Sequence, residues 1–163
     1  MRKILIAVAL AALGTGVVAA SDETAVLAVL HQFEVGFNMG GDMKDAMATC
    51  ADETSIIDSF PPHEWHGAGA CSKWLSDWNA FSKANGITDA VGTIGKPRHI
   101  EITADHAYVV GPSIFAYKVN GKPVIERGST FTVAMQKGPS GWRITGWSYG
   151  EGRQTAAKTD SSK

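Results

Sequence analysis

The sequence has little positive charge, and that charge is scattered along the chain. It holds 15 Lys and Arg residues against 16 Asp and Glu residues, and no basic stripe is present. Proteins that bind nucleic acid through its phosphates usually carry such a stripe, so nucleic acid is not an expected partner. Motifs for nucleotide, flavin or metal binding are also absent, and we therefore predict no cofactor and no metal.

The chain also lacks an apolar run long enough for a convincing membrane span. Its most apolar segment lies at residues 1–20 and is interrupted by glycine. A charged start at Arg2 and Lys3, an apolar stretch and a small-residue end at Ala20 are typical of a cleavable signal peptide. We therefore predict a protein that is periplasmic or secreted, cut after Ala20, with no membrane span afterwards. The remaining chain has 15 − 2 = 13 basic and 16 acidic residues, a formal charge of −3.

Cysteine is scarce, since Cys50 and Cys71 are the two that the sequence contains. Two cysteines at this spacing lack the paired pattern of a zinc site. Free thiols are uncommon outside the cytosol, so we predict a Cys50–Cys71 disulfide. Two buried thiols are the alternative. A bond across a loop of about twenty residues would add roughly 3 kcal/mol of stability.

Apolar spacing predicts three helices in the first half of the chain. Residues 22–39 carry Val26, Val29, Leu30, Phe33 and Phe37 at three- and four-residue steps, which gives one apolar stripe. A short helix follows Asp42, and a third spans residues 70–84 with an aromatic stripe that is more typical of a core than of a cofactor site.

Alternating apolar residues predict strands in the second half. One strand at 54–60 ends at Pro61-Pro62, because proline donates no ladder hydrogen bond. Residues 90–103 alternate with a bend near Pro97, and Asn120-Gly121 predicts a tight turn between two long strands. The last strand covers 142–149, and we expect residues 151–163 to form a flexible tail.

This order of elements predicts one α+β domain at residues 21–150. We expect about three helices from the N-terminal half to pack on the concave face of a cone-shaped, curved, mixed but mostly antiparallel sheet. A sheet closed by helices on one side leaves a space between the layers, and such spaces are common ligand sites.

Two stretches carry a resemblance to a known family. They are "FEVGFNMGGDMKDAMATCADETSIIDSF" and "HAYVVGPSIFAYKVNGKPVIERGSTFTVAMQKGPSGWRITGWSYG". With these stretches the chain resembles the nuclear transport factor 2-like superfamily, in its SnoaL-like, ketosteroid isomerase-like branch. The resemblance implies the cone-shaped fold, which hosts isomerases, dehydratases, cyclases and non-catalytic binders.

The resemblance places Asp58 where ketosteroid isomerases have their general base. Phe33 stands at the position of their oxyanion-binding tyrosine and has no donor, and Ser129 lies near their second donor. From the residues alone, strand alternation puts Ile56, Asp58 and Phe60 on one face. If that face points to the core, desolvation raises the pKa of the carboxyl and makes it a usable proton acceptor. Alternatively, the face points to solvent, or Asp58 caps the following turn.

His63 and His66 follow the double proline with Glu64 between them. Three interpretations stay open: metal ligation, a histidine at the pocket mouth that shares a proton with Asp58, or a surface loop. We predict Asp58 and His63 as the catalytic pair. We further predict a cavity whose ligand-binding residues are Phe33, Phe37, Ile56, Phe60, Trp65, Trp78, Gly146 and Ser148.

On the last strand, alternation puts Gly146 and Ser148 on the face toward the helices, and Trp147 and Tyr149 on the outer face. An outer aromatic pair fits a homodimer interface, although a single exposed aromatic without a partner is the alternative.

The sequence therefore predicts an exported domain that binds a small apolar or aromatic molecule in its cavity. Acid–base turnover of the isomerase, dehydratase or cyclase type would add catalysis to binding. The alternatives are a non-catalytic carrier and a dimeric protein-interaction or accessory module of the cell envelope.

Overall fold

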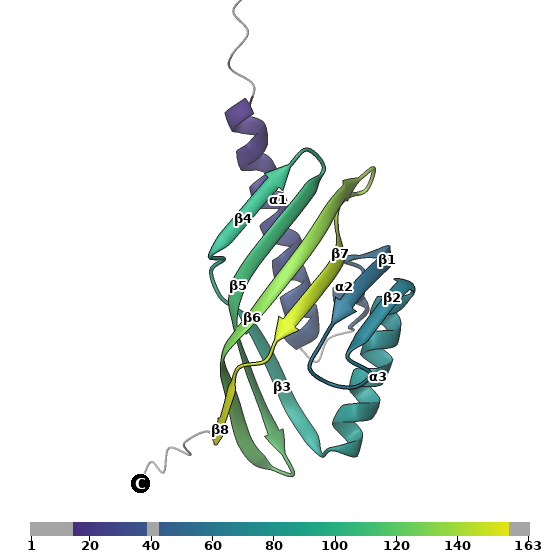
Figure 1. Ribbon diagram of the computed structural model, residues 1–163, viewed down its shortest axis with the longest axis vertical. Coiled ribbons are helices and arrows are strands. Elements are labelled where there is room, and N and C mark those ends of the chain that lie inside the picture. The colour runs from purple at the N-terminus through teal and green to yellow at the C-terminus, as the bar shows by residue number, and fades with distance from the viewer. Residues whose placement is uncertain (1–14, 39–42, 157–163) are drawn as a thin grey trace, which may run out of the picture.

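The computed structural model describes residues 15–38 and 43–156 (Figure 1). Most of the predicted signal peptide, residues 1–14, and the end of the predicted tail, residues 157–163, lie outside the described residues. In chain order the elements are α1 (Thr15–Asn38), α2 (Lys44–Met47), β1 (Cys50–Ile57), β2 (Glu64–Ala68), α3 (Ala70–Ala84), β3 (Ile87–Ile94), β4 (His99–Thr103), β5 (His106–Val119), β6 (Lys122–Gly138), β7 (Gly141–Gly150) and β8 (Arg153–Ala156).

The strands form one curved sheet of eight strands (Figure 1). Its main path runs β2-β1-β7-β6-β5-β3, while β4 also pairs with β5 and β8 with β6. The β1–β7 pair is parallel and the other pairs are antiparallel. The predicted α+β class, with a mixed but mostly antiparallel curved sheet, is thus confirmed. No helix within the described residues is long and apolar enough to cross a membrane.

The apolar stripe of α1 forms the centre of the core. Val26, Leu30 and Phe33 are each at most 6% exposed. Phe33 stacks on Phe131 of β6 at 5.8 Å between ring centroids and lies 5.2 Å from Trp147 of β7. The three- and four-residue spacing read from the sequence therefore does bury one face of the helix against the sheet.

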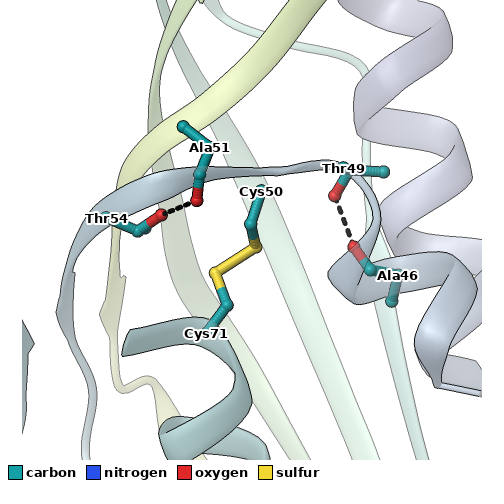
Figure 2. Close-up of a disulfide and its surroundings, with 6 residues drawn as sticks. All are labelled: Ala46, Thr49, Cys50, Ala51, Thr54 and Cys71. Carbon is teal, nitrogen blue, oxygen red and sulfur yellow. Dashed lines mark hydrogen bonds between the residues drawn. A yellow bond between two sulfur atoms is a disulfide. The ribbon is translucent and has the colours of Figure 1, made fainter. Parts of the chain in front are cut away.

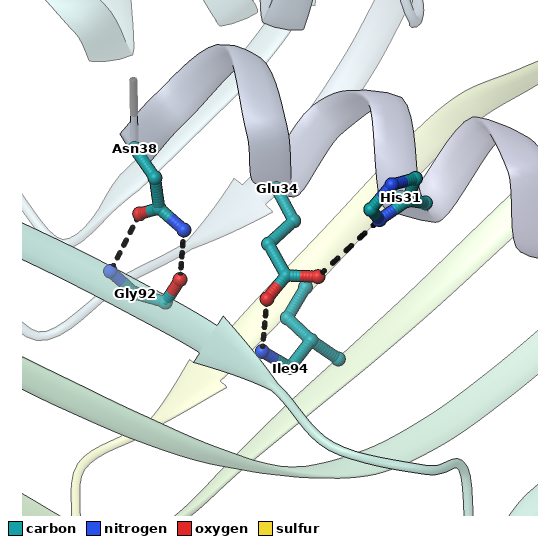
Figure 3. A network of polar contacts seen from close by, with 5 residues as sticks. All are labelled: His31, Glu34, Asn38, Gly92 and Ile94. Carbon is teal, nitrogen blue, oxygen red and sulfur yellow. Dashed lines mark hydrogen bonds and ion pairs between the residues drawn. The ribbon is translucent and has the colours of Figure 1, made fainter. Parts of the chain in front are cut away.

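The C-terminal end of α1 is fixed to the backbone of β3 by two polar side chains (Figure 3). Asn38 bonds both the N–H and the carbonyl of Gly92, and Glu34 accepts the Ile94 N–H at 3.1 Å. The other oxygen of Glu34 lies 3.9 Å from His31. Because β3 ends the main path of the sheet, these bonds occupy backbone groups that would otherwise form an open edge.

Cys50 and Cys71 form the predicted disulfide, which joins the start of β1 to the first turn of α3 (Figure 2). The hydroxyl of Thr49 donates to the carbonyl of Ala46 at 2.5 Å, just before β1, and closes the end of α2. The disulfide therefore ties α3 to β1, and the Thr49 hydrogen bond fixes the end of α2 just before the same strand.

Replacing both cysteines with serine is expected to lower the free energy of unfolding by roughly 3 kcal/mol, because the bond closes a loop across 21 positions. For a domain of this size, that loss corresponds to a fall in Tm of roughly 10 °C, measured by calorimetry. Wild-type protein treated with a reductant should show the same fall. An unchanged Tm in the double variant would contradict a stabilising bond.

The sequence-based assignment of faces on β7 is wrong beyond Ile144. Ile144 pairs with Met135 and Gly146 with the adjacent Ala134, so Thr145 is an extra residue without a partner on β6. Such a bulge reverses the alternation of side chains. Trp147, which is 4% exposed, therefore faces the helices instead of the outer surface. The homodimer interface predicted at Trp147 and Tyr149 thus loses the residues on which it was based.

Two further expectations are corrected by strand pairing. The predicted flexible tail from residue 151 is wrong for residues 153–156, because β8 pairs with β6 from Arg127↔Arg153 to Val124↔Ala156. The loop expected after the double proline contains β2, which pairs with β1 and sets Trp65 opposite Ile56. Both strands lack the length and clean alternation that make a strand recognisable in sequence.

Candidate functional site

A cavity of about 340 Å³ lies between the helices and the sheet. Its wall is built by α1, α3, the loop after β1 and strands β3, β5, β6 and β7. Ten of its 22 described lining residues are aromatic, namely Phe33, Phe37, Phe60, Trp74, Trp78, Phe81, Phe115, Tyr117, Phe131 and Tyr149. A concave, mostly apolar space with a few polar groups is the usual form of a small-molecule site.

Asp58 lines this cavity from the turn directly after β1. Its Oδ2 accepts a hydrogen bond from the indole N–H of Trp74 at 2.9 Å, and its Oδ1 accepts the Ser59 N–H at 2.7 Å. The backbone turn is closed by Asp58 N–H donating to the carbonyl of His63. The carboxyl is therefore held in one orientation at the aromatic wall by two donors from different elements.

Burial among the rings raises the pKa of Asp58 from 3.8 to about 6. The two hydrogen bonds from Ser59 and Trp74 oppose this rise, and the nearby Glu126 carboxyl adds to it. At neutral pH the group is therefore mostly ionised, yet close enough to its pKa to gain and lose a proton readily. An acid–base group with a pKa near the working pH suits proton transfer.

The raised pKa predicts a stability cost for Asp58 at neutral pH. A carboxyl with a folded-state pKa above its unfolded value contributes its full stability below about pH 4 and loses it as pH rises through about 6. A difference of about 2 pKa units corresponds to about 3 kcal/mol. Asp58→Asn abolishes this loss, but it also removes one of the two hydrogen bonds from Trp74 and Ser59, because an amide has a single acceptor oxygen, at a cost of about 1 kcal/mol. We expect the variant to be about 2 kcal/mol more stable at pH 7.

Urea unfolding of wild type and Asp58→Asn from pH 4 to 7.5 tests this expectation. The gain should shrink steadily toward pH 4, where wild-type Asp58 is protonated in the folded state. A variant that is less stable than wild type at every pH would contradict a desolvated carboxyl.

The predicted ligand-binding residues separate into two groups. Phe33, Phe37, Phe60 and Trp78 line the cavity together with Asp58. The other four lie outside its wall, and they are Ile56, Trp65, Gly146 and Ser148.

The residues outside the wall have structural surroundings of their own. Ile56 is fully buried in the core. Trp65 packs on Phe60 and donates its indole N–H to Asp77 of α3 at 2.8 Å. A Cβ at Gly146 would lie 2.7 Å from the carbonyl oxygen of Ser55, so this glycine permits the close approach of β1 and β7. Ser148 was predicted from a face assignment that the bulge at Thr145 reverses.

His63 does not join Asp58 as a proton partner. Its side chain is exposed, and its Nδ1 lies 3.2 Å from the backbone carbonyl of Asp58, not from the carboxyl. The turn brings the two backbones together while the carboxyl is directed to Trp74. His66 is also exposed and lies 3.4 Å from Glu64. Among the described residues, no group of three His, Cys, Asp or Glu side chains is arranged to hold a metal.

A second polar group in the cavity wall, centred on Glu126, was not predicted from the sequence. The side chain of Glu126 is 3% exposed, and its Oε1 accepts hydrogen bonds from Tyr149 Oη at 2.6 Å, Ser129 Oγ at 2.8 Å and Gly152 N–H at 2.8 Å. Burial and the adjacent Glu126 raise the pKa of the Tyr149 hydroxyl above its usual value.

The sequence gives only a weak signal for this group. Glu126 stands in a long strand whose face cannot be fixed without the strand register, and Tyr149 was assigned to the outer face because the bulge was not foreseen. Gly152 lies in the segment expected to be frayed, although a Cβ there would lie 2.3 Å from the carbonyl oxygen of Arg127.

No family model matches the sequence, and no curated protein does either. Solved structures, in contrast, match over nearly the whole chain. A hexachlorocyclohexane dehydrochlorinase, LinA type 2, superposes with a TM-score of 0.73 at 9% identity over 88% of this chain and 94% of the other. An NTF2-like protein with a cystatin-like fold from Novosphingobium aromaticivorans gives a TM-score of 0.65 at 14% identity, over 82% and 83%.

This chain has the nuclear transport factor 2-like fold. A scytalone dehydratase candidate from Novosphingobium aromaticivorans is a further NTF2-like neighbour, with a TM-score of 0.69 at 10% identity over 86% of this chain and 91% of the other. The fold resemblance predicted from the two sequence stretches is confirmed. At these identities the NTF2-like fold is what the comparisons establish, and function is argued from the cavity.

Proposed function

We propose that this protein binds a small apolar or aromatic molecule in its cavity and that Asp58 accepts a proton from it. The observation that carries the proposal is a partly buried carboxyl with a pKa of about 6 at the wall of an aromatic cavity. The reaction class is an isomerase-, dehydratase- or cyclase-type step. In such a step Asp58 takes the proton from a carbon next to a carbonyl or from a carbon beside a leaving group.

The chemistry follows from how Asp58 is held. The Trp74 and Ser59 donors keep the carboxylate in place and hold back its pKa, while the surrounding rings exclude water from it. After abstraction, the same carboxyl carries the proton. Returning the proton to a different atom of the ligand is isomerisation. Loss of the neighbouring leaving group during abstraction is elimination.

A non-catalytic carrier is the second candidate, and one observation favours it. Phe33 lines the cavity where the resembling isomerases carry a donor tyrosine, and it has no donor group. Tyr149 does have a hydroxyl, but that hydroxyl donates to Glu126. Without a donor for the oxygen that becomes negative, enolisation loses a few kcal/mol of stabilisation.

Export of the protein also belongs to the proposal. The Cys50–Cys71 disulfide supports it, because such bonds persist in oxidising compartments. The pattern at residues 1–20 is typical of a cleavable signal peptide. These two features together support a periplasmic or secreted location.

The proposed function is tested in two stages. Native mass spectrometry of protein purified from its own host should show a small apolar compound that dissociates on unfolding. That compound is then incubated with the protein in deuterium oxide, and NMR follows deuterium incorporation. Incorporation at an activated carbon, or formation of product, supports proton transfer by the protein. Tight retention of the compound without deuterium incorporation or product would favour the non-catalytic carrier. Absence of both a retained compound and exchange would contradict the proposal.

A further inference from the structure

The charged groups among the described residues of the cavity wall all have the same sign. Four of these residues carry a carboxyl side chain, and none of them is Lys, Arg or His. Glu34 and Asp58 lie on the side of α1 and α3, while Glu126 and Glu151 lie on the side of the sheet and the segment after β7. A wall with several anionic groups and no cationic group creates a negative potential inside a space of low dielectric.

Three of these carboxyls accept hydrogen bonds from donors within the chain that explain their structural roles. Glu34 accepts the Ile94 N–H, Asp58 accepts Trp74 and Ser59, and Glu151 accepts the Gln154 side-chain amide at 2.6 Å. Glu34, Asp58 and Glu151 therefore each have a structural role in the cavity wall.

Glu126 differs because it is nearly fully buried and only half satisfied. All three of its hydrogen bonds from described residues end on Oε1, and Oε2 accepts none from them. Among the described residues Oε2 is not one of the buried polar atoms that lack a partner, so this oxygen keeps accessible surface and can still accept a hydrogen bond. Since Glu126 is a cavity-lining residue, a ligand in the cavity is in position to supply the missing donor.

The aromatic walls suit a positive charge as well as an apolar body. Phe37 of α1 lies 6.1 Å from Trp74 and 6.3 Å from Trp78, and Phe115 of β5 lies 5.7 Å from Trp78. The faces of such rings carry negative partial charge and attract ammonium groups, indole most strongly. Desolvation of the cation inside the cavity strengthens this attraction.

We propose that the ligand of this cavity is an organic cation, an aromatic or apolar amine bound as its ammonium ion, with Glu126 Oε2 as the anchor for the charge. This inference rests on the proposed function, because it names the class of molecule that fills the same cavity. Asp58 remains the proton acceptor, and Glu126 fixes the orientation of the ligand. Anionic ligands are rejected because no described group of the wall compensates their charge.

The cation also predicts a pH dependence of binding. Asp58 protonates as pH falls through about 6, which removes one negative charge from the wall. Amine affinity should therefore fall a few-fold between pH 7.5 and 5, while the affinity for a neutral ligand stays constant. The titratable groups that face the cavity from the surrounding elements are Glu34, Asp58, Tyr117, Glu126, Tyr149 and Glu151.

A matched trio of probes tests the charge preference by isothermal titration calorimetry at pH 7.5. Naphthylethylamine, naphthylethanol and naphthylacetate share one ring system and differ in charge. We expect the amine to bind at least ten-fold more tightly than the alcohol, and the carboxylate to bind weakest. Glu126→Gln should reduce the preference for the amine to about two-fold while leaving alcohol affinity within a factor of two.

A control variant and a stability check keep the test interpretable. Glu101→Gln removes the same charge from an exposed side chain on β4, outside the cavity wall, and should leave the amine preference unchanged. Glu126→Gln retains an amide oxygen for Tyr149, Ser129 and Gly152, and its Tm is measured alongside. If that variant does not fold, the preference of wild type for the amine over the alcohol still decides the cation inference, because it requires no substitution.

The outcomes separate the two proposals. Equal affinity for amine and alcohol, or a preference for the carboxylate, overturns the cation inference and leaves cavity binding intact. A preference for the amine that Glu126→Gln does not change overturns the anchor. Absence of binding for all three probes, with native mass spectrometry showing no retained compound, contradicts the proposed function itself.

Discussion

Asp58→Asn is expected to lower the rate of deuterium exchange into the bound ligand, or of product formation, by roughly 10²- to 10⁴-fold, the usual contribution of a positioned general base. The amide keeps the size of the side chain but cannot accept the proton. The wild-type rate should rise with pH through an apparent pKa near 6 and level off above it, as the carboxyl ionises. In the variant this pH dependence should disappear, because the group that titrates is absent.

The matched control is Asp52→Asn. Asp52 lies on β1, the strand that leads into the Asp58 turn, with an exposed side chain outside the cavity wall, and the chemical change is identical. Its rate should remain within two-fold of wild type. Equal rates for wild type and Asp58→Asn would remove Asp58 as the base and leave binding as the role of the cavity.

Trp74→Ala is expected to cost the largest amount of stability of any substitution considered, about 3 to 5 kcal/mol, as for other buried tryptophans. Trp74 is 4% exposed and contacts Trp147 at 5.2 Å, Phe37 at 6.1 Å and Phe60 at 6.1 Å between ring centroids. Its removal empties the point where α1, α3, β7 and the Asp58 turn meet. Chemical denaturation measures the loss.

Trp74→Phe separates packing from hydrogen bonding at the same position. It keeps an aromatic ring and loses the N–H that donates to Asp58. That donor lowers the pKa of Asp58, so we expect the pKa to rise above about 6 in this variant, followed by NMR titration. Trp78→Ala, which truncates a half-buried ring of the cavity wall, should cost less than Trp74→Ala. An equal or greater cost would contradict the central position of Trp74.

Features with a local physical cause could be predicted from the sequence. The stripe from Val26 to Phe37 fixes which face of α1 is buried, and Asn120-Gly121 marks the turn between β5 and β6, where both residues adopt positive φ. The cysteine pair in a chain with a signal-like start predicts the disulfide. The position of Asp58 on the cavity wall, in the turn directly after β1, agrees with the alternation expected for residues 54–60 together with the family resemblance.

Features that depend on pairing between distant strands could not be predicted. The extra residue at Thr145 changes which side chains of β7 face the helices, and nothing in "GWRITGWSYG" marks it. Glu126 becomes a buried cavity residue because Tyr149 and Gly152 are brought to it by β7 and the turn into β8. Charge, burial and strand register together define the site around Glu126. The alternation of apolar and polar residues along a strand is not enough to predict such a site.

NMR titration of Asp58 tests most directly whether its carboxyl is buried in the aromatic cavity. Protein with ¹³C-labelled aspartate is titrated by NMR from pH 3 to 8, and the Asp58 signal is assigned by its loss in Asp58→Asn. Burial of the carboxyl predicts an apparent pKa of about 6 for Asp58. A value near 3.8, the ordinary value of a solvated aspartate, would contradict it.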